Sequence, residues 1–298
     1  MAGWALGQAG LKTATRKGLA ALILGANMPD IDVFFGSAPW DPLAIHRGFT
    51  HGLIGGVVVM PPILAGLLWL LDRWQLSNDK QFKSGLPMRF GWLVALSYLG
   101  ALTHPLLDVL TTYSVQLLSP FSNLWFHADG LFIIDLWVWL LLAISIGISK
   151  RREQRGKEWR QVPRAAIGIL FAYIGLNLLI TDRANAAVRE WAGERRVDAL
   201  FASPPPVAFW RRGLVWRENG CYRRSRYDPL AGGFAAGSDC HATNMDDPLV
   251  REAIRRDPRL RKFLKWSILP QAEVVRKRCS AQVAIGDARY GVGRRSNL

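Results

Sequence analysis

The chain has 298 residues, half of them hydrophobic and 20% charged, and a formal net charge of +15. This apolar content is high for a soluble protein, and no nucleic-acid-reading motif accompanies the basic excess, so we expect membrane lipids and no nucleic acid as partners. The composition also changes along the chain. Residues 1–181 hold long apolar runs, whereas residues 182–298 carry 23 Lys and Arg against 13 Asp and Glu. We predict a membrane-embedded domain over 1–181 and a soluble C-terminal cap over 182–298.

The N-terminal segment combines Lys12, Arg16 and Lys17 with an apolar run over residues 19–26, a pattern that resembles a signal peptide. We expect no cleavage, because the apolar run is short and an acidic motif follows it at once. The segment instead predicts a retained, partly embedded helix over residues 4–26. This helix should end at Asn27-Met28-Pro29, since the residue before a proline disfavours helical geometry.

Four apolar segments that could cross a bilayer follow the N-terminal helix, at residues 52–71, 90–110, 131–149 and 165–180. Pro61-Pro62 should kink the first of them. The intervening loops 72–89 and 150–164 are rich in Lys and Arg, so the positive-inside rule places them in the cytoplasm. Alternation of the spans then brings one set of polar side chains to the outer membrane face: His51, His104, His127 and Asp135.

The tail predicts a small α+β fold. A helix should continue to about Phe201, and Asn219-Gly220 between two alternating runs predicts a hairpin with a type I′ turn. Residues 247–266 predict one or two short helices broken at Asp257-Pro258, and residues 273–285 alternate as one or two strands. The expected fold class is therefore an all-α multi-pass membrane domain, with an N-terminal helix and about four transmembrane helices, followed by a small α+β domain.

The three cysteines all lie in the tail, and none has the CxxC spacing of a structural zinc site: Cys221, Cys240 and Cys279. Two states are open. One disulfide and one free thiol would fit an extracytoplasmic tail, and three free thiols would fit a reducing compartment.

The residues that point to chemistry lie mainly between Asn27 and His51. Asp30 and Asp32 stand one residue apart, and His46 and His51 follow at a spacing of five. Carboxylate oxygen and imidazole nitrogen are ligands for Zn²⁺, Mn²⁺ and Fe²⁺. Polar side chains beside apolar spans are costly, so their presence indicates function.

A second pair, His104 and Asp108, lies four residues apart on an apolar helix and therefore shares one face. The alternative for this pair is a buried contact that only ties helices together. Arg47 could hold a phosphate oxygen or pair with Asp30 or Asp32. His127 and Asp135 are reserve ligands, and His241 is expected at the surface. The predicted metal ligands are Asp30, Asp32, His46, His51, His104 and Asp108, with Asp32 and Arg47 as candidate catalytic residues.

Three motifs resemble the YdjM/YbcI family of bacterial inner-membrane, predicted metal-dependent hydrolases: Met28-Pro29-Asp30-Ile31-Asp32, His46-Arg47-Gly48-Phe49-Thr50-His51 and Leu102-Thr103-His104-Pro105-Leu106-Leu107-Asp108. The resemblance covers most of residues 18–140. It departs where Leu136 follows Asp135, a position at which the family often has proline. The family's distant similarity to zinc-dependent phospholipases C implies phosphoester hydrolysis.

We therefore expect a multi-pass protein of the bacterial inner membrane that acts as a metal-dependent hydrolase. The metal would be zinc, with manganese or iron as alternatives, and the substrate a phospholipid or another phosphorylated molecule. Two rivals are a non-enzymatic scaffold or metal-handling protein with a structural His/Asp cluster, and a transporter. The transporter is disfavoured because no inverted repeat is visible.

Overall fold

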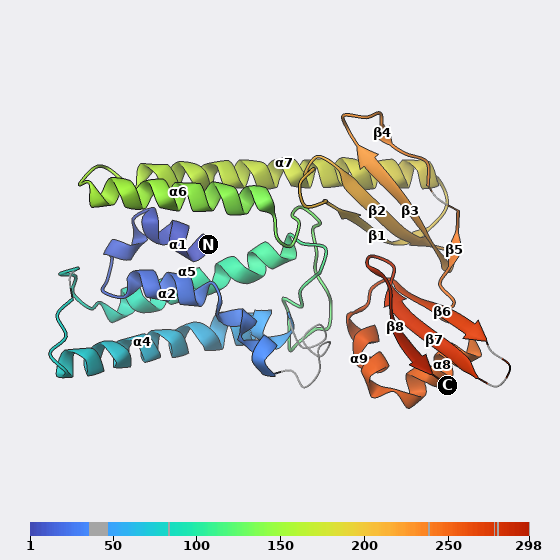
Figure 1. Ribbon diagram of the computed structural model, residues 1–298, viewed down its shortest axis with the longest axis horizontal. Coiled ribbons are helices and arrows are strands. Elements are labelled where there is room, and N and C mark those ends of the chain that lie inside the picture. The colour runs from blue at the N-terminus through green and yellow to red at the C-terminus, as the bar shows by residue number, and fades with distance from the viewer. Residues whose placement is uncertain (36–46, 83, 238, 277, 279, 298) are drawn as a thin grey trace. The chain divides into compact units, whose positions relative to one another are not determined.

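The computed structural model describes residues 1–35, 47–82, 84–237, 239–276, 278 and 280–297 (Figure 1). It divides into a helical unit, made of Met1–Gly36, Ile45–Ala128 and Ile133–Leu176, and a C-terminal unit made mainly of Asn177–Leu298. The fold class predicted from the sequence is confirmed: a mostly helical membrane domain is followed by a small α+β region.

The helical unit contains long helices and shorter helical turns. The α-helices are α1 (Ala2–Gln8), α2 (Gly18–Gly25), α4 (Met60–Ser77), α5 (Phe90–Val109), α6 (Leu136–Gln154) and α7 (Gln161–Ala192), the last of which continues into the C-terminal unit. Short 3₁₀ turns cover Leu11–Thr13, Met28–Phe35 and Phe49–His51, and a π-helix covers Leu53–Val59.

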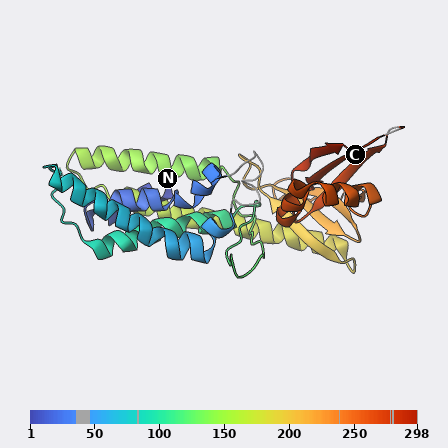
Figure 2. The same cartoon turned by 90° about the horizontal axis from the view of Figure 1, so that it is seen from below.

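The single N-terminal helix predicted over residues 4–26 is wrong. The segment forms a hairpin of α1 and α2, separated at Gly10 and Lys17, which both have positive φ. Helical geometry cannot continue through such residues, and glycine adopts positive φ without strain. Figures 1 and 2 show this hairpin between α6 on one side and α4 and α5 on the other.

The hairpin supplies the core of the helical unit. On one side Leu22 packs with Leu64 of α4 and Leu96 of α5, and all three are buried. On the other side Ala5 packs with Leu142 of α6 and Leu170 of α7. The hairpin therefore joins two helix pairs, α4 with α5 and α6 with α7.

Two glycines let α2 approach α5 closely. A Cβ at Gly100 would lie 2.6 Å from the carbonyl oxygen of Leu22, and a Cβ at Gly25 would lie 2.7 Å from that of Ser97. Real Cβ atoms do not approach so closely. Small residues at helix contacts are the usual way in which membrane helices bring their backbones together.

Among the described residues, three helical segments are long and apolar enough to cross a membrane: Leu53–Ser77, Phe90–Val109 and Gln161–Ala192. The first begins as a π-helix, and Pro61 and Pro62 fall in the first turn of the α-helix that follows, where no N–H is needed. Helix α6 is apolar over its first 14 residues and basic at its end. The last segment is longer than predicted, because the fourth span and the tail helix form one continuous α7.

The C-terminal unit contains two antiparallel sheets. The first has the order β1-β2-β3-β4, with β5 also paired to β3, and the second has the order β6-β7-β8. The strands are β1 (Val197–Ser203), β2 (Arg212–Glu218), β3 (Cys221–Asp228), β4 (Gly233–Phe234), β5 (His241–Ala242), β6 (Pro270–Arg276), β7 (Ala281–Asp287) and β8 (Gly291–Asn297).

Most local predictions for the tail are confirmed. Asn219 and Gly220 have φ of 48° and 77° and join β2 to β3, as a type I′ turn requires. Helices α8 (Pro248–Arg256) and α9 (Pro258–Trp266) meet at Asp257-Pro258. The helix predicted to reach Phe201 is wrong, because α7 ends at Ala192 and Phe201 lies in β1. Phe201 is buried as part of the sheet, so tertiary packing decides its conformation.

Candidate metal centre

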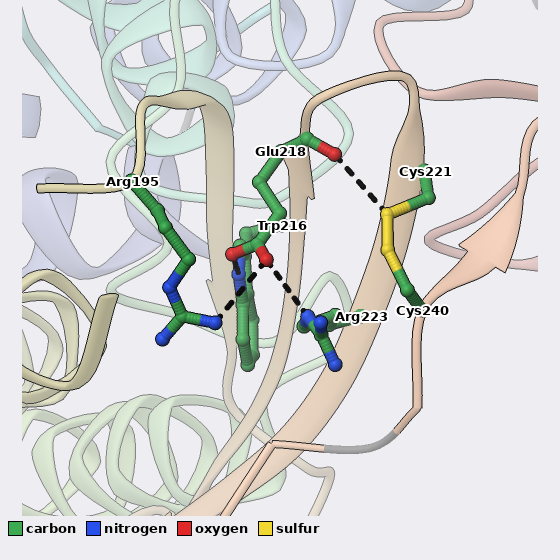
Figure 3. Close-up of a disulfide and its surroundings, with 6 residues drawn as sticks. All are labelled: Arg195, Trp216, Glu218, Cys221, Arg223 and Cys240. Carbon is green, nitrogen blue, oxygen red and sulfur yellow. Dashed lines mark hydrogen bonds and ion pairs between the residues drawn. A yellow bond between two sulfur atoms is a disulfide. The ribbon is translucent and has the colours of Figure 1, made fainter. Parts of the chain in front are cut away.

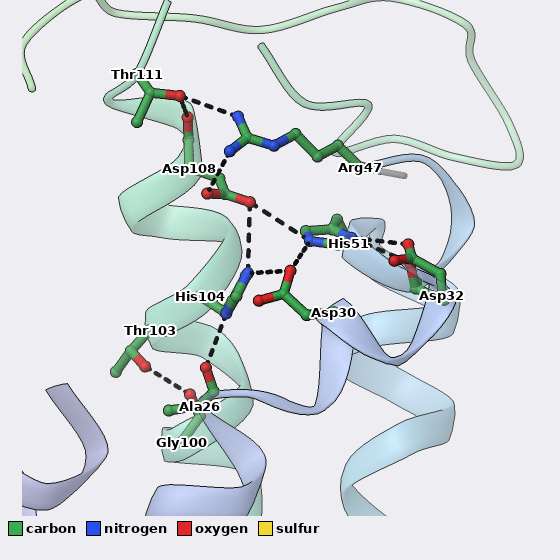
Figure 4. A network of polar contacts seen from close by, with 11 residues as sticks. Ala26, Asp30, Asp32, Arg47, His51, Gly100, Thr103, His104, Asp108 and Thr111 are labelled. Atoms are coloured by element: carbon green, nitrogen blue, oxygen red, sulfur yellow. Dashed lines mark hydrogen bonds and ion pairs between the residues drawn. The ribbon is translucent and has the colours of Figure 1, made fainter. Parts of the chain in front are cut away.

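Three side chains from distant parts of the chain converge in the helical unit. Asp30, His51 and His104 each offer one ligand atom, and these atoms all lie within 4.8 Å of one another. His51 is fully buried, and Asp30 is 44% exposed. Figure 4 shows the two imidazoles and the Asp30 carboxylate pointing toward one another. This arrangement is a possible metal-binding triad.

Local sequence explains how each ligand reaches the cluster. Asp30 lies in the 3₁₀ turn that follows α2, and His51 ends the turn Phe49–His51. His104 lies in α5, one turn before Asp108, so both side chains leave the same helix face. The turn before the first span and the C-terminal part of α5 therefore meet at the end of the hairpin.

Asp108 lies beside the triad, close to both imidazoles. Its Oδ2 lies 3.4 Å from Nε2 of His51 and 3.6 Å from Nε2 of His104. Asp30 Oδ1 lies 3.4 Å and 3.2 Å from the same two nitrogens. Ligands 2.0–2.1 Å from a tetrahedral zinc ion stand about 3.3 Å apart. Within the described residues Asp108 Oδ2 is buried and accepts no hydrogen bond, so the donor set fits a divalent cation.

The opposite ring nitrogens hold both imidazoles in one tautomer. Nδ1 of His104 lies 2.8 Å from the carbonyl oxygen of Ala26, which can only accept a hydrogen bond. Nδ1 of His51 lies 3.0 Å from Oγ1 of Thr50, and that hydroxyl donates to Oδ2 of Asp32. With a proton on each Nδ1, both Nε2 lone pairs face the cluster.

Asp32 thus occupies a different position from Asp30. Its carboxylate is buried and lies 3.5 Å from Nδ1 of His51, on the side of the ring away from Asp30 (Figure 4). A carboxylate in this position orients a metal-ligating histidine. The sequence suggested three roles for Asp32: metal ligand, base, or partner of a histidine Nδ1–H group. The geometry fits the last of these.

Arg47 is buried beside the cluster and pairs with Asp108, not with Asp30 or Asp32. Its Nη2 lies 3.2 Å from Asp108 Oδ1, and its Nη1 donates to Oγ1 of Thr111 at 3.0 Å. The residue has a φ of 66° and lies in the segment before His51. Arg47 therefore brings a fixed positive charge next to four candidate ligands.

The cluster also shifts the proton affinities of its members. Burial opposes ionisation of Asp30, but hydrogen bonds with His104 and His51 outweigh it and hold the pKa of Asp30 well below its usual value. Burial lowers the pKa of His51, and the carboxylates of Asp30 and Asp32 more than reverse this and raise it. Asp30 is therefore a carboxylate at neutral pH, as a metal ligand must be.

The other predicted residues divide as follows. His46 lies outside the described residues. Asp135 caps α6 by accepting from the backbone N–H groups of Trp137 and Val138, and the hydroxyl of Tyr173 donates to its other oxygen at 3.0 Å. Asp135 is thus occupied in holding α6 against α7. His127 does not belong to the triad, and His241 is exposed, as expected.

Sequence reasoning missed two parts of the site: Thr50 and the Ala26 carbonyl. Thr50 directly precedes His51, which was a usable signal for a local contact. The role of Ala26 had no such signal, because it depends on α2 ending beside His104.

A cavity of about 390 Å³ opens beside the cluster. One wall is polar and carries Asp30, Arg47, His104 and Asp108. Another part of the lining is apolar, with side chains from α5 and α6: Leu107, Val138, Trp139 and Leu142. The ligands therefore border a space that can accept a molecule with a polar end and an apolar end.

These features define a multi-pass membrane protein with a possible His/Asp metal centre at one end of its helical unit. The family model for the YdjM inner membrane protein matches residues 1–184. The chain belongs to this family, as its motifs suggested, and is an inner membrane protein. No curated protein and no solved structure matches it.

Proposed function

We propose that this protein is a metal-dependent hydrolase of the inner membrane that cleaves a phosphoester in an amphiphilic molecule. The observation that carries the proposal is the convergence of Asp30, His51 and His104 at the spacing of metal ligands, with Asp108 close to both imidazoles. Two imidazoles with two carboxylates suit zinc, and also manganese or iron.

A bound divalent ion would supply hydroxide at neutral pH, because it lowers the pKa of a coordinated water to about 7. The protein's own groups would do the rest. The Asp32 carboxylate and Thr50 fix the ring of His51, and the Ala26 carbonyl fixes that of His104. Arg47 would hold an anionic oxygen of the substrate, since it lines the same cavity as the ligands.

We infer the substrate class from the polar and apolar parts of the cavity lining. A phosphate group would lie between the ligands and Arg47, and an alkyl chain would lie along Val138, Trp139 and Leu142. Burial of apolar groups favours this placement by about 0.8 kcal/mol per methylene. Phospholipids and other lipid phosphates have this architecture.

A second possible function is that of a structural metal site, because Asp108 lies close enough to the triad to act as a fourth donor. Four protein donors can complete a tetrahedral zinc site, and a closed site is structural. The protein would then be a scaffold or a metal-handling protein. Asp30 favours catalysis, because it is 44% exposed and borders the cavity, so the centre is open on that side.

An activity screen separates the two functions. Purified protein loaded with Zn²⁺ or Mn²⁺ would be assayed with alkyl phosphates and alkyl p-nitrophenyl phosphates of increasing chain length. Hydrolysis that needs the metal, and whose KM falls as the chain lengthens, is the expected result. Arg47→Lys should raise KM more than it lowers kcat, because lysine keeps the charge but not the paired hydrogen bonds. A protein that holds its metal but hydrolyses none of these esters would favour the structural centre.

A further inference from the structure

The N-terminal hairpin brings its turn to the end of the helical unit opposite the metal centre. Lys12 Nζ lies 2.5 Å from Glu153 near the end of α6, and Arg16 Nη2 lies 2.8 Å from Asp72 near the end of α4. The Nε of Arg164, at the start of α7, donates to the carbonyl oxygen of Ala9 at 2.9 Å. The turn of the hairpin, the end of α4 and the connection between α6 and α7 therefore meet at this end.

Both limbs of the hairpin return to the centre. Ala2 at the start of α1 and Ala26 at the end of α2 border the same cavity as Asp30 and His104. The hairpin thus enters and leaves the helical unit on one side. A single N-terminal span would instead have placed its two ends at opposite ends of the helical unit. The sequence alone did not distinguish this span from a hairpin.

Basic residues are distributed very unequally between the two ends. At the end opposite the centre, residues 9–17 hold 3 Lys and Arg, residues 72–82 and 84–89 together hold 3, and residues 150–164 hold 7. Residues 27–35, 47–52 and 110–128, at the end with the centre, hold one, and this is the buried Arg47. Short loops rich in Lys and Arg stay in the cytoplasm. This distribution favours the periplasm for the end of the helical unit with the metal centre.

Helix α6 runs between the two ends of the helical unit. Val138, Trp139 and Leu142 in its first turns border the cavity, and Glu153 in its last turn pairs with Lys12. Its end reaches the basic side, so α7 begins on that side and must leave on the other. The connectivity then predicts that the C-terminal unit follows α7 on the side of the membrane opposite the basic loops.

A disulfide in the C-terminal unit gives independent support (Figure 3). Cys221 of β3 and Cys240 are bonded, with their Cα atoms 5.6 Å apart, within the range that disulfides require. The bond links the first residue of β3 to the residue before β5. Disulfides persist in the bacterial periplasm and are rare in the cytosol.

We propose that the metal centre and the C-terminal unit both face the periplasm. If the proposed function holds, the substrate is then a phosphoester that is presented in the outer leaflet of the inner membrane or dissolved in the periplasm. The assignment of the side rests on charge, connectivity and the disulfide, and does not depend on the proposed function.

Cysteine labelling in whole cells tests the side without any measurement of activity. In a Cys279→Ser background, one new thiol would be placed at exposed Asn123, on the side of the centre, and another at exposed Lys157, on the basic side. A maleimide that passes the outer but not the inner membrane should label Asn123→Cys in intact cells. It should label Lys157→Cys only after lysis. Labelling of Lys157→Cys in intact cells, or protection of Asn123→Cys there, would overturn the proposal.

The native cysteines provide a second measurement. Cells would be quenched with acid, and the protein would be treated with a polymer-linked maleimide before and after reduction. Two further thiols, Cys221 and Cys240, should react only after reduction. Reaction of both without reduction would show a reducing compartment and contradict the assignment. If the side is confirmed but outer-leaflet lipid phosphates and soluble periplasmic phosphoesters are both left uncleaved, the proposed function fails while the orientation stands.

Discussion

Replacing Gly100 with alanine should weaken metal binding without touching a ligand. Gly100 lies where α5 crosses α2, and the new Cβ would stand 2.6 Å from the Leu22 carbonyl oxygen and 3.1 Å from the Ala26 nitrogen. Both neighbours are backbone atoms of the hairpin, so relief requires the end of α2 to move away from α5. The same stretch of backbone holds the ring of His104.

The size of the effect follows from these distances. Ordinary contacts begin near 3.4 Å, so the backbone must give by about 0.8 Å at the tightest contact. The hydrogen bond from His104 Nδ1 to the Ala26 carbonyl is 2.8 Å long, and the same displacement would stretch it to about 3.6 Å, beyond hydrogen-bonding range. Overpacking costs about 1–3 kcal/mol, and loss of such an outer contact lowers metal affinity about 10- to 100-fold.

The assay is metal titration of the purified protein in detergent, in parallel with thermal unfolding. Gly91→Ala is the matched control, because it lies in the same helix with no atom within 4 Å of the new Cβ. The control should keep its metal affinity. If Gly100→Ala bound metal as tightly as the wild type and unfolded at the same temperature, the dependence of His104 on the hairpin would be refuted.

Three further changes test other parts of the account. Asp32→Asn should leave one metal per protein but weaken its binding about 10- to 100-fold in titrations, because the carboxylate only orients His51. Asp72→Asn should destabilise the protein by about 3 kcal/mol in thermal unfolding, because it leaves the cation of Arg16 without its buried partner. Burial opposes ionisation of Asp287, but its pairing with arginine holds its pKa below the ordinary value. The stability that the Asp287 carboxylate contributes should be complete above about pH 4 and lost as the pH falls below it. The loss would be seen as faster amide exchange of the backbone N–H groups bonded to Asp287. Asp287→Asn should remove that pH dependence.

Much of the site could be predicted because its ligands lie in short motifs with readable geometry. The spacing of His104 and Asp108 fixes a shared helix face, and the motif around Asp30 stands directly after an apolar segment. The turn at Asn219-Gly220 was equally local, since positive φ at two successive positions selects those residues. Each of these predictions depends on a few neighbouring residues.

The features that could not be predicted correctly depend on contacts between distant segments. The apolar residues between Trp4 and Ala26 suit one helix as well as two, and the break is stabilised by Lys12 and Arg16 meeting α6 and α4. The different positions of Asp30 and Asp32 relative to His51 could not be predicted either. Both are carboxylates in one turn, and only the position of His51 decides which one faces Nε2.

The most direct test of the central claim is the metal content of the purified protein by elemental analysis. The account predicts about one divalent ion per chain in the wild type, with zinc as the expected element. His51→Ala and His104→Ala should lose the ion and still insert in the membrane, while His241→Ala, which changes an exposed histidine, should retain it. Full metal content in His51→Ala and His104→Ala would contradict the claim that these imidazoles share an ion.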